Sequence, residues 1–95
     1  MNISLCERYE GENLVRVFVF INAELGRESE ALEKLRQVEG VIEAYLLYGV
    51  HDMVAVVEVD TVDRVKEVVS ETIRRIEGVR STLTMIVMEG KVKQK

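Results

Sequence analysis

The stretch LLYGVHDMVAVVEV, residues 46–59, decides the fold because it joins two apolar runs through a very short connection. The first run, VIEAYLLY, covers residues 41–48, and the second, MVAVVEV, covers residues 53–59. Both are rich in β-branched and aromatic residues, which is typical of strands. A crossover between parallel strands needs about a dozen residues or more. The sequence therefore predicts an antiparallel hairpin in the middle of the chain.

The turn of this hairpin is Gly49-Val50-His51-Asp52. Glycine takes a positive φ without steric cost, and tight hairpins require one, so we expect it at Gly49. The Asp52 carboxylate is expected to accept from backbone N–H groups nearby. His51, the single histidine, has no Ser, Cys or second His close by in the sequence. It is interpreted as an exposed turn residue rather than a base or a metal ligand.

Working outward, the chain repeats one pattern of strand and helix. Residues 14–21 read as a strand, residues 27–40 as an amphipathic helix that Gly40 ends, and residues 79–89 as a last strand. A second helix is predicted between Thr61, which offers an N-terminal cap, and Gly78. The Glu-Gly-Val sequence at 39–41 recurs at 77–79, which indicates a duplicated unit. We predict an α+β ferredoxin-like βαββαβ sandwich: a four-stranded antiparallel sheet with both helices on one face. MNISLCERY, residues 1–9, adds a candidate short strand.

The predicted strands are apolar on both faces. In residues 14–21, one face carries Val15, Val17, Val19 and Ile21, and the other carries Leu14, Phe18 and Phe20. Two helices cover only one face of a sheet. Such an exposed apolar patch exceeds what a soluble monomer tolerates. A copy of the same chain, packed sheet to sheet across a two-fold axis, would cover it, so we expect a homodimer. The alternative is a monomer whose N-terminal segment folds over the sheet.

The composition sets limits on function. Ninety-five residues with 47% hydrophobic and 32% charged residues predict one globular domain, with no membrane span and no secretory signal, hence a cytoplasmic protein. The net charge of −4 argues against direct nucleic-acid binding. One cysteine, Cys6, and one histidine supply no metal cluster, and we expect no cofactor. The absence of proline and the excess of Glu, Lys and Arg over Asn and Gln are a sign of a thermophile.

Three hydroxyls, of Ser81, Thr82 and Thr84, open an otherwise apolar strand. Threonine is a good strand former, so one interpretation is an edge that faces water. The other combines these hydroxyls with the Asp52 carboxylate. An amino acid needs an anion for its ammonium group and hydrogen-bond donors for its carboxylate, and the two groups together would supply both.

These motifs resemble the C-terminal effector domain of the Lrp/AsnC, or feast/famine, transcription regulators. The resemblance covers residues 14–89 and rests on the G-x-x-D turn Gly49–Asp52 and on Gly78-Val79 followed by Thr82 and Thr84. It implies homodimers that assemble into tetramers or octamers, with amino-acid effectors between neighbouring dimers. It also implies a set of ligand-binding residues: Gly49, Asp52, Thr82 and Thr84, with Tyr48, Val50, His51 and Ser81 as pocket walls.

The sequence departs from the typical regulator before its first strand. Only residues 1–13 precede that strand, whereas such regulators place a helix-turn-helix domain of roughly 60 residues there. The chain therefore resembles a stand-alone effector module at 14–89, with an N-terminal extension and a tail at 90–95. Such a module would sense amino acids alone or oligomerise with full-length Lrp/AsnC regulators.

Two other hypotheses remain. A small dimeric enzyme of the monooxygenase or isomerase type can share this fold, but the chain has no nucleophile and base at a suitable spacing, so we expect no enzyme. A structural oligomerisation adaptor would form the same assembly without a ligand.

Overall fold

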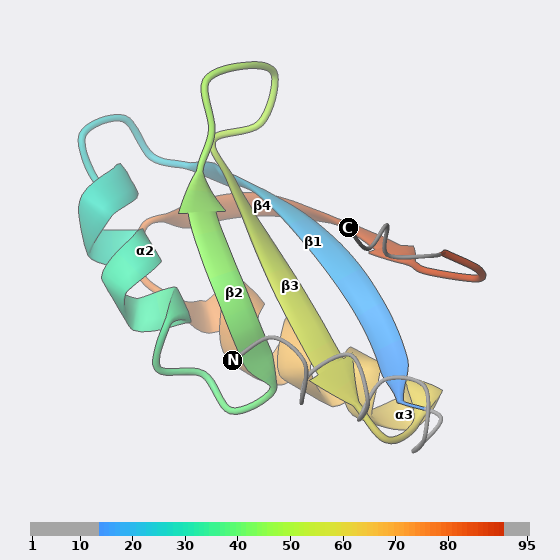
Figure 1. The fold of residues 1–95 in the computed structure, drawn as a ribbon. Coiled ribbons are helices and arrows are strands. Elements are labelled where there is room, and N and C mark those ends of the chain that lie inside the picture. The colour runs from blue at the N-terminus through green and yellow to red at the C-terminus, as the bar shows by residue number, and fades with distance from the viewer. Residues whose placement is uncertain (1–13, 91–95) are drawn as a thin grey trace.

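The computed structural model describes residues 14–90 and confirms the predicted βαββαβ order. The four strands form one antiparallel sheet in the order β2-β3-β1-β4, with the helices on one face (Figure 1). The candidate strand at residues 1–9 and Cys6 lie outside the described residues. The elements are β1 (Val15–Ala23), α2 (Glu28–Leu35), β2 (Val41–Leu46), β3 (Met53–Val59), α3 (Val62–Lys66) with its π and 3₁₀ continuations, and β4 (Val79–Ile86).

Alternate strand residues form the core between the sheet and the helices. Val17, Val19 and Ile21 of β1 are completely buried, because strand side chains alternate and these three face the helices. Helix residues such as Leu35 and Ile73 pack against them in the same cluster. The predicted face pattern of the first strand is therefore confirmed.

The other face of the sheet, here called the helix-free face, carries no helix among the described elements. Arg16 and Glu58 lie opposite each other on it and form an ion pair of 3.8 Å. The rest of the face is mostly apolar and partly exposed, with Glu43, Asn22 and Ser81 as polar exceptions. The register places these apolar side chains on it: Phe18, Phe20, Tyr45, Val54, Val56, Leu83 and Met85.

The second helix begins as predicted and continues differently. The Thr61 hydroxyl accepts from the backbone N–H of Arg64 at 3.2 Å, which confirms the cap. The predicted helix is confirmed, but its α-helical part ends at Lys66 and continues as a π-helix, Glu67–Thr72, and a 3₁₀ turn, Ile73–Arg75. A helical periodicity in sequence does not distinguish these hydrogen-bond patterns. Gly40 and Gly78 follow the two helices with φ of 102° and 99°, as predicted for helix ends.

Two strands are shorter than predicted. β2 ends at Leu46 instead of residue 48, because Leu46 is the last residue paired with β3. β4 ends at Ile86 instead of residue 89, where its pairing with β1 stops. In both cases the apolar sequence continues beyond the last paired residue, so the apolar pattern predicted a longer strand than the structure contains.

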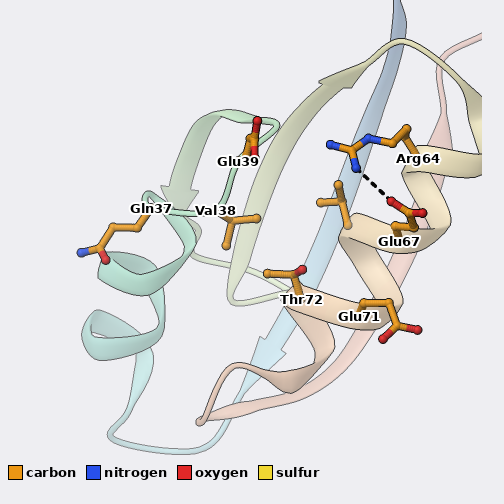
Figure 2. Close-up of a pocket in the computed structure, with 8 residues that line it drawn as sticks. Gln37, Val38, Glu39, Arg64, Glu67, Glu71 and Thr72 are labelled. Atoms are coloured by element: carbon orange, nitrogen blue, oxygen red, sulfur yellow. Dashed lines mark hydrogen bonds and ion pairs between the residues drawn. The ribbon is translucent and has the colours of Figure 1, made fainter.

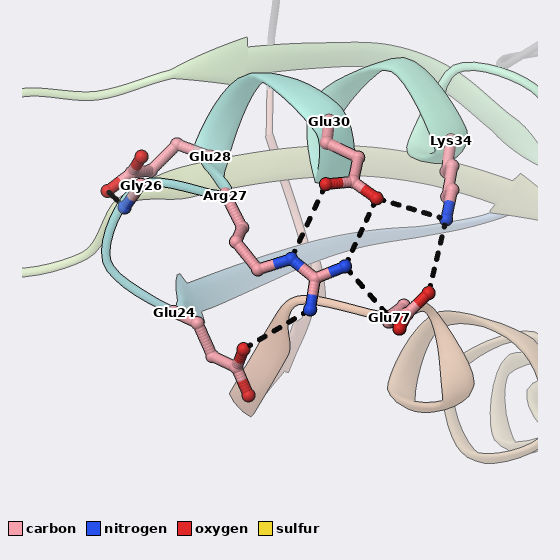
Figure 3. Close-up of polar contacts among 7 residues, drawn as sticks. All are labelled: Glu24, Gly26, Arg27, Glu28, Glu30, Lys34 and Glu77. Carbon is pink, nitrogen blue, oxygen red and sulfur yellow. Dashed lines mark hydrogen bonds and ion pairs between the residues drawn. The ribbon is translucent and has the colours of Figure 1, made fainter.

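A network of exposed charges ties α2 to the turn before β4 (Figure 3). Arg27 pairs with Glu30 at 3.1 Å and with Glu24 and Glu77 at 3.5 Å, and Lys34 joins Glu30 at 3.6 Å. The hydrogen bond and charge of Arg27 lower the pKa of Glu30 below its usual value. This network holds the end of the second helix against the start of the first.

Candidate functional site

The β2–β3 hairpin is a six-residue loop, residues 47–52, rather than a four-residue turn. The backbone N–H of Leu47 donates to the carbonyl of Asp52 at 2.8 Å and closes the loop. Tyr48 and Val50 are almost fully exposed at its tip. The prediction of a positive φ at Gly49 is wrong, since only Gly26, Gly40 and Gly78 have one among the described glycines. The loop therefore reverses the chain without a left-handed glycine at its tip.

Asp52 fastens the hairpin to the end of β1. Its Oδ2 accepts from the backbone N–H of Ala23 at 2.8 Å, and its own N–H donates to the carbonyl of Ile21 at 3.0 Å. The carboxylate therefore accepts from a backbone N–H, as expected, but the donor belongs to β1 and not to the hairpin turn. The partner lies 29 residues away in the sequence. A carboxylate has acceptor sites beyond this one bond, so Asp52 retains the capacity to bind a cationic group.

The hydroxyl residues of β4 lie at the same end of the sheet as the hairpin. Ile21 lies opposite Met53 on one side and opposite Thr82 on the other. Asn22 donates from its Nδ2 to the Ser81 Oγ at 3.3 Å. The hairpin and the start of β4 lie on either side of β1, and two strands in this arrangement are about 10 Å apart. A small molecule that contacts both would therefore have to extend across β1.

The predicted site residues lie on two faces of the sheet. Thr82 and Thr84 lie opposite Ile21 and Val19, so they point to the helix side. The His51 ring lies against Phe20, with 5.3 Å between centroids, which places it on the helix-free face. The prediction of an exposed His51 is wrong, since it is half-buried, and its Nδ1 has no hydrogen-bond partner within residues 14–90. A single chain does not gather all eight predicted residues into one cavity.

The residues that sequence reasoning missed are Ala23 and Phe20. Ala23 contributes through its backbone, and no side-chain pattern identifies a backbone donor. Phe20 belongs to the predicted apolar face, but its contact with His51 depends on how the hairpin folds back. Neither relationship has a signal in the sequence.

A cavity of about 560 Å³ lies away from the hairpin, between the second helix and the loop that follows α2 (Figure 2). It is lined by Gln37, Glu39, Glu71 and Thr72 among others, and its Arg64 pairs with Glu67 at 2.9 Å. None of the predicted ligand-binding residues lines it. Thr84 lines a smaller groove of about 200 Å³ between α3 and β4.

Metal-binding clusters and membrane-spanning helices are both absent from the described part of the chain. Residues 14–90 contain no group of three or more His, Cys, Asp or Glu side chains arranged to hold a metal ion. Over the same residues, no helix has the length and hydropathy required to cross a membrane.

Comparison with known proteins identifies the family. A family model described as the Lrp/AsnC ligand binding domain matches residues 16–95. The chain belongs to the Lrp/AsnC ligand-binding domain family. This confirms the resemblance drawn from the G-x-x-D turn and the threonine strand, and the matched range includes both. No curated protein matches the chain.

Some of the solved structures that are similar to this Lrp/AsnC domain are covered almost completely by it, and others are covered only in part. FFRP-DM1 is 35% identical, with 78% of this chain and 99% of that chain covered and a TM-score of 0.74. A hypothetical protein, PHS023 from Pyrococcus horikoshii, is 34% identical over 80% of this chain and 92% of its own, with a TM-score of 0.73. E. coli AsnC is 26% identical, with 93% of this chain and 59% of that chain covered and a TM-score of 0.81. The family supports a regulatory, effector-binding domain.

Proposed function

We propose that this domain is an amino-acid sensor that binds its effector at the hairpin end of the sheet and acts as a homo-oligomer. It would act alone or by assembling with full-length Lrp/AsnC regulators. The observation that carries the proposal is the position of Asp52. Its carboxylate is fixed at the end of β1, with the hydroxyls of Ser81 and Thr82 on the far side of that strand.

The chemistry of these groups suits a zwitterion. The Asp52 carboxylate would accept from the ammonium group of the effector, and charge assistance makes such bonds stronger than neutral ones. The hydroxyls of Thr82 and Thr84, which lie on the same side of β4, would donate to its carboxylate. Gly49 would let the ligand approach the backbone, and Tyr48, Val50, His51 and Ser81 would form walls. Because these residues lie on two faces, we infer that a neighbouring subunit completes the pocket.

The helix-free face supports the homodimer within this proposal. Tyr45 and Met85 are each 51% exposed, and Phe18 and Leu83 are also exposed. An apolar patch of this kind marks an interaction site. A second copy, packed sheet to sheet, would cover it, and further contacts between dimers would give a tetramer or octamer.

The effector site is tested by thermal melting of the purified protein with each of the twenty amino acids. An effector at a hundred times its dissociation constant stabilises the folded state by about 2.7 kcal/mol, which is a readily measured shift. We expect a selective shift that Asp52→Asn abolishes and that Asp60→Asn, at the opposite end of β3, retains. Retention of the shift in Asp52→Asn would contradict the site. No shift with any amino acid would favour the adaptor hypothesis.

The sheet-to-sheet dimer needs its own test. Phe18→Lys places a charge on the helix-free face, and we expect it to lower the native mass measured by light scattering. Gln37→Lys adds the same charge on an exposed residue after α2 and should leave the mass unchanged. An unchanged mass in Phe18→Lys would remove this face from the assembly.

A further inference from the structure

The groove of about 200 Å³ between the second helix and β4, here called the α3–β4 groove, is lined mainly by apolar side chains. Val62 and Ile86 line it, and they are 49% and 44% exposed. Val65 and Val69, which belong to the buried core, line it as well. Burial of exposed apolar surface is favourable. A segment that fills this groove would therefore extend the core outward.

The first strand begins beside this groove. Val17 of β1 lies opposite Ile86 of β4. The second helix starts at Val62, just after β3, whose last residue lies opposite Val15. Figure 1 shows β1 beginning next to α3. The chain that precedes β1 therefore enters the sheet at the end where both Val62 and Ile86 lie.

Residues 1–13, MNISLCERYEGEN, precede this strand and lie outside the described residues. Met1, Ile3 and Leu5 are apolar, and the two residues between them are polar. Because the side chains of an extended chain alternate between two sides, these three would share one side. The sequence of the segment thus offers an apolar face that matches the groove.

The length of the segment is sufficient to reach the groove. Residues 6–13 span at most about 3.3 Å each, or about 26 Å together. Val62 and Val69 lie only about 11 Å apart along a helix. Gly11 and Asn13 favour turns, so the chain can reverse its direction before β1.

The charge of the segment also suits this groove. Residues 7–12 carry three glutamates and one arginine, and the charged residue that lines the groove is Lys66. Opposite charges would therefore meet there. The family match begins at residue 16, so the segment precedes the part of the chain that resembles other Lrp/AsnC domains.

We propose that residues 1–6 of this chain fill its own α3–β4 groove, with Ile3 and Leu5 as the apolar anchors. Leu5, which is nearer to β1 in the sequence, packs against Val62, and Ile3 packs further along the helix, toward Ser70. The segment then holds the start of β1, the second helix and β4 together. Docking requires neither an effector nor a second copy of the chain.

Cross-linking tests the position of the segment in a Cys6→Ser background. Ser70 is exposed and lines the groove, and a disulfide forms only where two Cα atoms lie within about 7 Å. We expect Ile3→Cys/Ser70→Cys to form a disulfide within one chain on mild oxidation. The control pair, Ile3→Cys/Glu33→Cys, should not form one. It uses an exposed residue of α2, which packs near β2 at the far edge of the sheet.

Three outcomes of the cross-linking would overturn the proposal. They are equal yields for the two pairs, no link at Ser70, and a link between two chains, which would show that a neighbour fills the groove.

Thermal melting tests the same contact without a disulfide. Leu5→Asp places a charge in the apolar groove, and we expect it to lower the melting temperature by at least about 4 °C. Ser4→Asp adds the same charge on the opposite side of the segment and should change it much less. Residues in contact have non-additive effects, so Leu5→Asp should have little further effect in a Val62→Asp background. Additive effects, or equal effects of the Leu5 and Ser4 variants, would overturn the proposal.

The docked segment has a consequence for the effector that rests on the proposed function. Thr84 lines the same groove, so the segment would cover one of the hydroxyls proposed for the effector. In the melts with amino acids, the oxidised Ile3→Cys/Ser70→Cys chain should therefore show a smaller shift than the reduced chain. An equal shift would contradict the role of Thr84 in the effector site, whereas the cross-link alone decides the position of the segment.

Discussion

The backbone N–H of Ala23 donates a 2.8 Å hydrogen bond to Asp52 Oδ2, so the hairpin is held to β1 by a side chain. In Asp52→Ala this partly buried N–H loses its acceptor, and the cost of an unsatisfied buried group is about 1–3 kcal/mol. Asp52→Asn retains an oxygen acceptor and should lose less. Urea denaturation of the two variants measures the difference. Equal losses would show that the bond contributes nothing.

Glycine substitutions should separate two positions that look alike in sequence. Gly78 has a φ of 99°, and an added Cβ would lie 3.3 Å from the Cβ of Arg27. A left-handed conformation costs a residue with a Cβ about 1–2 kcal/mol. Gly78→Ala should therefore lose at least that much stability. Gly49 has no positive φ, and a Cβ added there would have no atom within 4 Å, so Gly49→Ala should be nearly neutral. Thermal melts of the two variants make the comparison.

The Thr61 cap offers a local test of the second helix. Its hydroxyl satisfies the N–H of Arg64, and loss of such a cap costs about 1 kcal/mol. Thr61→Ala should be destabilised by that amount, whereas Thr61→Ser, which keeps the hydroxyl, should lose much less. Chemical denaturation measures both. A loss of the same size in Thr61→Ser would attribute the effect to the methyl group instead.

The charge network predicts a pH dependence of stability. Arg27, through its hydrogen bond and charge, and then Lys34 lower the pKa of Glu30, so the folded state favours its ionised form. This stabilisation is present above the pKa of the unfolded chain, about 4.3, and is lost as the pH falls through the lower pKa of the folded state. Glu30→Gln should therefore be less stable than the wild type at pH 7, with a difference that shrinks toward pH 3.

The control for this effect is Glu89→Gln, which removes an exposed carboxylate near the C-terminal end of the described chain. Denaturant midpoints at several pH values measure both variants. A difference for Glu30→Gln that stays constant from pH 7 to pH 3 would contradict the assigned role of its charge. High salt should reduce the difference, because exposed charges are screened.

The sequence predicted both ends of β3 correctly, and it predicted the ends of the neighbouring strands less well. β3 lies between the Asp52 turn and the Thr61 cap, and both of these chemical signals end a strand. β2 and β4 lack such signals at their C-terminal ends, and their true limits depend on where a partner strand stops. Hydrophobic alternation alone does not contain that information.

The sequence predicted a set of residues for the candidate site, but it did not predict how these residues are arranged in space. The convergence of Asp52 and Thr82 on one end of the sheet follows from the strand order, which the fold class implies. The split between His51 and Thr82 onto opposite faces depends on register and on the path of the hairpin. The acceptor role of Asp52 was predicted, but its donor at Ala23 lies in a distant strand.

The unequal edges of the sheet set a limit on growth. A sheet with two receptive edges adds copies at both ends and extends into a fibre. Within residues 14–90, the β2 edge is bulged and carries Glu43, and both features disfavour the addition of another strand. The β4 edge lacks them beyond Arg80, so the two edges are protected unequally. A sheet that is protected at one edge cannot extend in both directions, which works against the growth of fibres.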